Sequence, residues 1–302
     1  MAVEKKLLAI IGPTASGKSN LAMEIARKTG AEIVSADSMQ VYRGMDIGTA
    51  KPTKAERAEV VHHLVDVVEP SETFTVARFL EMADRIIATA KVPLIVVGGT
   101  PLYYKALFEG LFEGPAADEE VRERLLSADV TELHERLKIV DPEAANRIHV
   151  NDRKRLVRAL EVFELTGKPI SSLQTDWESG RARHEAVWIG LAWDRGSLNR
   201  RINARVQAMM DAGWLHEVSA LKVYSGRISK AAREAMGYQE LFDFFLRNRG
   251  QSVGDAVEQI KIATRQLARR QMKWLKRFPN VHWIPGEAPL ETQVKDVLAR
   301  WP

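Results

Sequence analysis

One segment near the start of the chain has the residue types and the spacing of a phosphate-binding loop. Residues 12–19 match the pattern G-x-x-x-x-G-K-[ST], directly after an apolar run and before an amphipathic segment. Glycines in such a loop let backbone N–H groups point inward at phosphate oxygens, and the following helix adds partial positive charge. The sequence therefore predicts a P-loop that binds a diphosphate through Gly12, Pro13, Thr14, Ala15, Ser16, Gly17, Lys18 and Ser19.

Two side chains of this loop have specific uses. Lys18 supplies a full positive charge to the phosphates, and the Ser19 hydroxyl can ligate a Mg2+ ion that bridges them. The loop is typical of nucleotide-binding proteins, including those that bind ATP. A dinucleotide-binding fold is set aside, because the loop lacks G-x-G-x-x-G and has Lys18 instead.

The carboxylate that nucleotide hydrolases use to hold magnesium is not evident. Such enzymes usually pair the P-loop with an apolar strand that ends in an acidic residue. Here the apolar run 94–97 is followed by Gly98-Gly99-Thr100. Asp66, after His63-Leu64-Val65, could fill that role, so hydrolysis of a nucleotide is disfavoured and still open.

Two further polar residues follow apolar runs that read as strands. Ligands of open parallel sheets bind beyond the carboxyl ends of the strands, so Asp37 and Thr100 are expected beside the P-loop. A carboxylate next to phosphates suits a general base, although an aspartate followed by serine also opens many turns. The Thr100 hydroxyl could donate a hydrogen bond to a leaving oxygen.

Short β-branched runs alternate with helical patterns, which is typical of a parallel sheet covered by helices on both faces. Between residues 115 and 180 the pattern changes to charged, leucine-punctuated helices. We therefore predict an α/β fold with a P-loop NTPase-like parallel sheet in residues 1–114 and 181–302, and a helical insertion domain in residues 115–180. The expected strands are residues 7–11, 32–35, 63–68, 94–97, 187–191 and 281–284.

These residues resemble the tRNA dimethylallyltransferases, also called tRNA isopentenyltransferases. The resemblance runs in order along nearly the whole chain, and its second segment is far more specific than a P-loop. The matching segments are residues 12–19; residues 35–52; Gly98-Gly99-Thr100 with Leu102-Tyr103; Arg147-Ile148-His149 with Asn151-Asp152; Arg201-Ile202 with Arg205-Val206; Gly237-Tyr238 with Glu240; and Thr264-Arg265-Gln266 with Arg270-Gln271 and Trp274.

The resemblance implies transfer of a dimethylallyl group from dimethylallyl diphosphate to N6 of the adenosine 3′ adjacent to the anticodon, with release of diphosphate. It implies that Asp37 takes the N6 proton and that Thr100 donates to the bridging oxygen. It also implies diphosphate or RNA-phosphate contacts by Arg201 and Arg205, and Mg2+ as cofactor. Contacts to the tRNA are implied for Ser38, Met39, Gln40 and Tyr103.

One residue departs from the family pattern. Pro101 stands where many members have glycine. Because proline has no N–H and fixes φ near −65°, the loop that carries Thr100 loses one backbone donor at this point.

A basic segment near the end of the chain suits a polyanionic substrate. Residues 259–278 contain seven Lys and Arg residues and no Asp or Glu, although the net charge of the whole chain is only +4. In a helix, Arg265, Arg269 and Lys273 share one face, which predicts contacts with tRNA; a solvated amphipathic face is the alternative. Arg153 and Arg158, at the start of an expected helix in the insertion, are predicted to contact the anticodon stem-loop.

Composition narrows the remaining possibilities. The chain has no cysteine, which excludes disulfides and a cysteine nucleophile, and no run approaches the roughly 20 apolar residues of a membrane span. We expect a cytoplasmic, monomeric protein without a membrane partner. The alternative enzyme is a P-loop small-molecule kinase that uses ATP, and a non-enzymatic alternative is an RNA-binding module with a regulatory nucleotide site.

Overall fold

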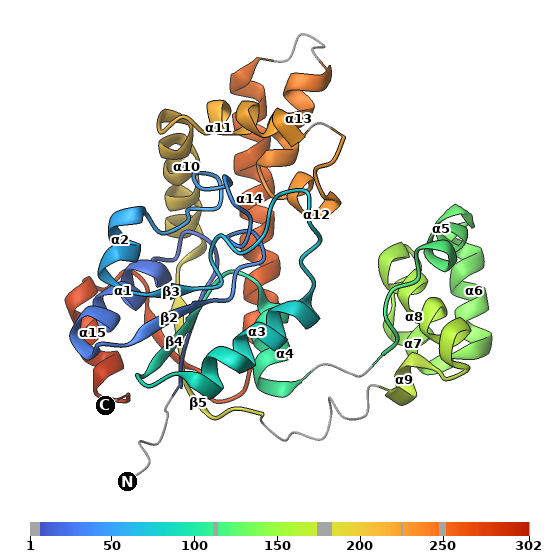
Figure 1. Ribbon diagram of the computed structural model, residues 1–302, viewed down its shortest axis with the longest axis horizontal. Coiled ribbons are helices and arrows are strands. Elements are labelled where there is room, and N and C mark those ends of the chain that lie inside the picture. Colours follow the sequence, from blue (N-terminus) through green and yellow to red (C-terminus); the bar gives the residue numbers. More distant parts are fainter. Residues whose placement is uncertain (1–6, 111–113, 174–182, 225, 248–251, 302) are drawn as a thin grey trace. The chain divides into compact units, whose positions relative to one another are not determined.

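The computed structural model describes residues 7–110, 114–173, 183–224, 226–247 and 252–301 (Figure 1). The chain forms two compact units. Residues Met1–Leu107 and His184–Pro302 form the core unit, and residues Phe108–Arg183 form the insertion unit. This division begins the insertion unit at residue 108 rather than 115 and ends it at 183 rather than 180.

The described part of the core unit contains a six-stranded sheet in which all neighbouring strands are parallel. Leu8 pairs with Ile95 and Val34 with Val96, which fixes the register of the central strands. Every residue of the two central strands is buried, as in sheets with both faces covered. In spatial order the strands are β3 (His62–His63), β2 (Glu32–Ser35), β4 (Leu94–Val97), β1 (Leu7–Ile11), β5 (Ala186–Ala192) and β6 (His282–Pro285).

The predicted strand over residues 63–68 is wrong beyond its first residue. β3 ends at His63, because Leu64 and Asp66 have positive φ angles of 62° and 57°. Backbone hydrogen bonds then join this segment to the loop after β2, from Asp66 N–H to Gln40 O at 3.1 Å and from Val67 N–H to Val41 O at 2.8 Å. The segment thereby supports that loop instead of lengthening the sheet.

Helices cover the sheet and extend beyond its carboxyl edge (Figure 1). α1 packs against α15, and their apolar faces join the strands in one buried core cluster. No helix within the described ranges is both long enough and apolar enough to cross a membrane. The helices of the core unit are α1 (Lys18–Thr29), α2 (Lys54–Glu59), α3 (Val76–Thr89), α4 (Pro101–Glu109, whose last two residues fall in the insertion unit), α10 (Arg195–Asp211), α11 (Trp214–Ala220), the 3-10 helix η2 (Leu221–Tyr224), α12 (Lys230–Arg233), α13 (Tyr238–Arg247), α14 (Val253–Leu275) and α15 (Leu290–Leu298).

The strand order brings three chain segments together at the carboxyl edge. β2, β4 and β1 are neighbours, so the residues that follow each of them emerge side by side. Ala36 N–H donates to Val97 O at 2.9 Å, and Thr100 N–H donates to Ala36 O at 3.1 Å. A Cβ atom on Gly98 would lie 2.1 Å from the Ala36 backbone, so only glycine permits this approach.

The regular structure among the described residues of the insertion unit is helical, and the unit has a core of its own. Leu133, Leu137 and Leu160 belong to one buried cluster in this unit. Glu161 is fully buried and forms ion pairs with Arg122 at 2.8 Å and Arg158 at 2.6 Å. The remaining helices are α5 (Glu119–Ser127), α6 (Val130–Val140), α7 (Pro142–Arg147), α8 (Arg153–Thr166) and α9 (Ile170–Leu173).

Candidate active site

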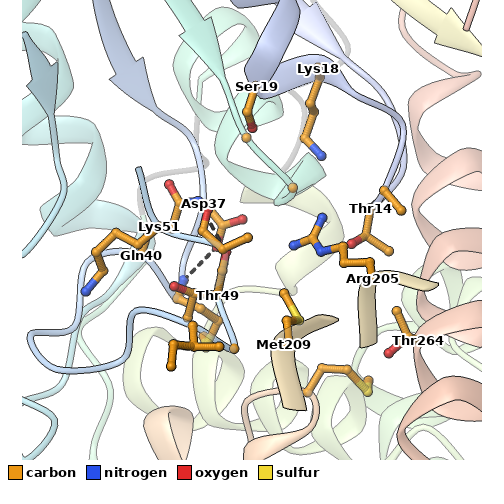
Figure 2. Close-up of a pocket in the computed structure, with 18 of the residues that line it drawn as sticks. Thr14, Lys18, Ser19, Asp37, Gln40, Thr49, Lys51, Arg205, Met209 and Thr264 are labelled. Carbon is orange, nitrogen blue, oxygen red and sulfur yellow. Dashed lines mark hydrogen bonds between the residues drawn. The ribbon is translucent and has the colours of Figure 1, made fainter. Parts of the chain in front are cut away.

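A pocket of about 940 Å³ opens at the carboxyl edge of the sheet, entirely within the core unit. Its walls come from the P-loop, the loop after β2, the end of β4, and helices α10 and α14 (Figure 2). This is where ligands bind in open α/β sheets. Among the predicted site residues, the pocket is lined by Thr14, Ala15, Ser16, Gly17, Lys18, Ser19, Asp37, Ser38, Met39, Gln40, Thr100, Arg201 and Arg205.

The P-loop is tightly curled. Gly17 has a φ of 93°, and Ala15 has a φ of 63° without being glycine. A Cβ on Gly12 would lie 2.7 Å from Ser16 Oγ, so glycine lets the loop close on itself. Gly12 and Pro13 do not line the pocket, but the Pro13 carbonyl accepts a hydrogen bond from Lys18 Nζ at 3.2 Å.

Two side chains that are distant in the sequence hold the P-loop through hydrogen bonds. Arg201 Nε, on α10, donates to Ala15 O at 2.9 Å, and Trp193 Nε1 donates to Ser16 O at 3.0 Å. The Arg201 guanidinium also lies over the Trp193 ring, 4.5 Å from its centroid. Arg201 therefore has a structural role in addition to lining the pocket.

The pocket concentrates positive charge. Figure 2 shows Lys18 and Arg205 directed into the same space, with Arg205 facing Asp37. Burial, helped by the charge of Arg205, lowers the pKa of Lys18 to about 8, while Asp37 acts in the opposite direction. Burial also lowers the pKa of Arg205. Two neighbouring cations make this wall of the pocket suited to an anionic group.

Asp37 closes a turn through one oxygen and leaves the other toward the pocket. Its Oδ1 accepts a hydrogen bond from Met39 N–H at 2.9 Å, which is an Asx turn. Its Oδ2 has no hydrogen-bond partner among the described residues, and it lies where a Cβ on Gly99 would come within 3.0 Å. One oxygen thus fixes the carboxylate and the other remains open to a ligand.

Thr100 is joined to the loop after β2. Its hydroxyl oxygen accepts from Ser38 N–H at 2.9 Å and donates to Ser38 Oγ at 3.1 Å. Pro101 is the first residue of α4, where a missing N–H breaks no helical hydrogen bond. Proline at this position is therefore compatible with the position of Thr100.

Gln40 is held at both ends of its amide. Ser35 Oγ donates to its Oε1 at 2.9 Å, and its Nε2 donates to the carbonyls of Thr49 and Ala50 at 3.3 Å each. Ser38 and Met39 lie beside it on the pocket wall. Ser38, Met39 and Gln40 thus form the side of the pocket next to Asp37.

Sequence reasoning missed the polar residues that brace this loop. Glu217, on α11, accepts hydrogen bonds from the N–H groups of Asp46, Ile47 and Gly48 at 2.7–3.3 Å. Lys51, whose side chain is only 1% exposed, forms 2.6 Å ion pairs with Asp46 and Asp66. Lys51 falls within a segment used for the family resemblance, whereas no local pattern points to Glu217.

Asp66 is not the missing magnesium ligand of a nucleotide hydrolase. Its carboxylate pairs with Lys51 at 2.6 Å and with Arg57 at 2.5 Å, and it does not line the pocket. No group of three or more His, Asp or Glu side chains within the described residues is arranged to hold a metal. The acidic residue expected of a P-loop hydrolase is therefore not supplied by this segment.

Tyr103 is buried within the core unit. Its side chain is 3% exposed and stacks on Phe79, with ring centroids 4.0 Å apart. Burial raises the pKa of its hydroxyl, and the charge of Asp37 adds to this effect. Tyr103 does not line the pocket, so a direct contact with tRNA would require this ring to move.

The two arginines predicted in the insertion unit are engaged within that unit. Arg153 Nη1 donates to the carbonyls of Leu126 and Ala128 at 2.8 and 2.6 Å. Arg158 pairs with the buried Glu161 and donates to Pro115 O at 2.8 Å. Both arginines therefore stabilise the start of α8 and its surroundings.

The basic segment forms most of helix α14, but its charged residues differ in their surroundings. Arg265 donates to Asn203 Oδ1 on α10 at 2.6 Å, whereas Arg269 and Lys273 are exposed. None of these three lines the pocket, although other residues of α14 do. The charged stripe and the pocket wall are thus different faces of one helix.

Comparison with known proteins identifies the family. The family model described as IPP transferase matches residues 40–278, and the one described as isopentenyl transferase matches residues 5–65. The chain belongs to the IPP transferase family. The isopentenyl transferase match includes residues 35–52, the segment that a P-loop alone does not explain.

Two bacterial relatives are similar over nearly their whole length, and a eukaryotic one over about three quarters of its length. The tRNA dimethylallyltransferase of Acetivibrio thermocellus is 44% identical over 92% of this chain and 91% of its own. The solved tRNA isopentenylpyrophosphate transferase of Bacillus halodurans is 36% identical, with a TM-score of 0.73 over 99% of this chain and 96% of that chain. A eukaryotic dimethylallyltransferase acting on tRNA has a TM-score of 0.82 at 27% identity, over 98% of this chain and 77% of that one. The fold is that of P-loop NTPase-like tRNA isopentenyltransferases.

Proposed function

We propose that this chain transfers a dimethylallyl group from dimethylallyl diphosphate to N6 of the adenosine 3′ adjacent to the anticodon of tRNA, and releases diphosphate. The observation that carries the proposal is the pocket itself, in which an anion cradle faces a carboxylate. Membership of the IPP transferase family supports this reaction over the small-molecule kinase.

The cationic side of the pocket suits departure of diphosphate. An allylic C–O bond breaks readily once the charge that builds up on the leaving group is neutralised. The P-loop amides, Lys18, Arg201 and Arg205 supply that neutralisation at one wall of the pocket. The Thr100 hydroxyl, after turning away from Ser38, donates a hydrogen bond to the bridging oxygen.

The opposite side suits activation of the adenine. An exocyclic amine is a weak nucleophile, because its lone pair is delocalised into the ring. As the new C–N6 bond forms and the C–O bond breaks, the N6 proton passes to Asp37 Oδ2. Ser38, Met39 and Gln40 lie next to Asp37 and contact the base.

The residues of the pocket fit a magnesium ion bound with the substrate. Mg2+ prefers oxygen ligands and usually keeps several waters, so one protein hydroxyl and the diphosphate oxygens suffice. The Ser19 hydroxyl lies at the start of α1 and lines the pocket. When bound, the ion would add positive charge next to the departing diphosphate.

The remainder of the tRNA must bind outside the pocket. A cavity of about 940 Å³ holds a base and a diphosphate but not an RNA stem. The target adenine therefore leaves its stack to enter, which favours a loop over a duplex. We assign tRNA contacts to Arg265, Arg269 and Lys273 on α14, to Arg153 and Arg158 in the insertion unit, and to Tyr103 near the pocket.

The setting of the reaction follows from its substrate. A tRNA-modifying enzyme of this kind works in the cytoplasm, and no membrane partner is required. We propose that it acts as a monomer.

A transfer assay tests the function. The protein is incubated with unmodified tRNA, Mg2+ and radiolabelled dimethylallyl diphosphate, without ATP. We expect the tRNA to become labelled, with one free diphosphate released for each prenyl group attached. Parallel reactions with radiolabelled ATP and a panel of small alcohols test the kinase alternative. Phosphorylation of a small molecule without labelled tRNA would contradict the proposal.

A further inference from the structure

One buried polar side chain on α14 is not explained by the basic face of that helix. Gln271 is 6% exposed, and it lines the pocket rather than the charged stripe. A buried amide is costly unless its donor and acceptor are both satisfied. The partners of Gln271 therefore indicate what it is for.

The amide of Gln271 joins two loops of the active site. Its Oε1 accepts a hydrogen bond from Thr14 N–H at 2.8 Å, and its Nε2 donates to Gly99 O at 2.6 Å. Thr14 belongs to the P-loop after β1, and Gly99 precedes Thr100 at the end of β4. Because one partner is an N–H and the other a carbonyl, the orientation of the amide is determined.

The surroundings of Gly99 leave little freedom. A Cβ on Gly99 would lie 3.2 Å from Gln271 Nε2 and 3.0 Å from Asp37 Oδ2. The amide of Gln271, the Gly99 backbone and the Asp37 carboxylate are thus packed closely together. A shift of the Gly99 carbonyl would also move Thr100, its covalent neighbour, relative to the P-loop.

Resting on the proposed function, we infer that Gln271 is a positioning residue that fixes the distance between the diphosphate cradle and the Thr100 loop. It ties both loops to α14, the helix whose opposite face carries Arg269 and Lys273. Glutamine suits this position because its amide offers a donor and an acceptor together.

Two substitutions separate the hydrogen bonds from side-chain volume. Gln271→Met keeps a similar length and removes both bonds, whereas Gln271→Glu keeps an acceptor for Thr14 and loses the donor to Gly99. We expect either change to lower kcat for tRNA prenylation about 10- to 100-fold, as misplaced reacting groups do. The Kd for tRNA stays within about twofold of wild type, because Gln271 does not lie on the exposed face of α14.

The glutamate variant gives a pH signature that a merely structural role would not. A protonated glutamic acid regains an O–H donor, and its pKa is raised because it is buried beside a carbonyl oxygen. The ratio of the variant's kcat to that of wild type should therefore rise as the pH is lowered from about 8 to about 6. Using this ratio cancels the pH dependence of groups that the substitution leaves unchanged.

Matched controls are Gln259→Met and Gln259→Glu, on the exposed part of the same helix, which should keep wild-type kcat. A wild-type kcat in Gln271→Met, or a low kcat in Gln271→Glu at every pH, would overturn the inference while leaving the function intact. Wild-type protein that yields no prenylated tRNA would refute the function instead. In that case amide hydrogen exchange still tests the contact between Thr14 and Gln271. We expect the Thr14 amide to exchange faster in Gln271→Met than in wild type, and an unchanged rate would overturn the inference.

Discussion

At the scale of single residues, Asp37 explains why local sequence could not choose between a turn residue and a base. The side chain that closes a turn is also the one that we propose as the proton acceptor. Oδ1 bonds to Met39 N–H at 2.9 Å and closes the turn, which leaves Oδ2 toward Gly99 and the pocket. The hydrogen bond that closes the turn thereby orients Oδ2, the oxygen that we propose as the proton acceptor.

Replacing Asp37 by asparagine should separate these roles. Asn keeps an oxygen acceptor for Met39 N–H but cannot take up a proton at neutral pH, so we expect kcat to fall about 10²- to 10⁴-fold. Single-turnover prenylation measures the rate, and filter binding should give a tRNA Kd close to that of wild type. Asp296→Asn on α15, outside the pocket, is the matched control. An equal loss of tRNA affinity would remove Asp37 from the role of base.

Lys18 should make diphosphate binding depend on pH. Its pKa of about 8 lies below the ordinary lysine value, because the side chain is buried next to Arg205. A bound diphosphate favours the charged lysine, so the pKa rises and a proton is taken up on binding. Little uptake is expected near pH 7, where free Lys18 is already charged, and uptake approaching one proton at about pH 9.

Calorimetry with dimethylallyl diphosphate, without tRNA, measures this uptake from the binding heats in two buffers of different ionisation enthalpy. Lys18→Met is the comparison, because it removes the titrating group and should abolish the pH-dependent part. Proton uptake that is the same in both proteins at about pH 9 would assign it to another group.

At the scale of elements, buried parallel strands were predictable because they are continuous apolar runs, and the ends of β2 and β4 led directly to Asp37 and Thr100. The segment after His63 misled the prediction, since an apolar pattern does not reveal the positive φ angles of Leu64 and Asp66. Nor could the sequence predict Glu217, which reaches Ile47 across 170 residues of chain. Polar contacts of that kind leave no periodic signal.

Helix α14 shows what the structure adds to a charge pattern. Arg265 is bonded to Asn203, whereas Arg269 and Lys273 are exposed and suited to phosphate contacts. The slope of log K against log salt is negative, and each lost phosphate contact makes it shallower by about 0.7–0.9. We expect Arg269→Ala with Lys273→Ala to make the slope for tRNA shallower by about 1.5, and Arg265→Ala to change it less.

Titrations of tRNA binding at several salt concentrations measure these slopes. Lys295→Ala, on α15, removes an exposed lysine from another helix and should leave the slope unchanged. A slope in the double variant equal to that of wild type would show that this face of α14 is only solvated.

At the scale of the whole molecule, the chain forms two units, each with its own core. Every residue that lines the pocket belongs to the core unit. The insertion unit has its own apolar core and a buried ion-pair network around Glu161.

The position of the new group on the tRNA tests the central claim most directly. After reaction with dimethylallyl diphosphate, the tRNA is digested with nucleases and the fragments are sequenced by mass spectrometry. We expect one dimethylallyl group per molecule, on N6 of the adenosine 3′ adjacent to the anticodon. A prenyl group at another position, or a tRNA that gains no mass although the dimethylallyl diphosphate is consumed, would contradict it.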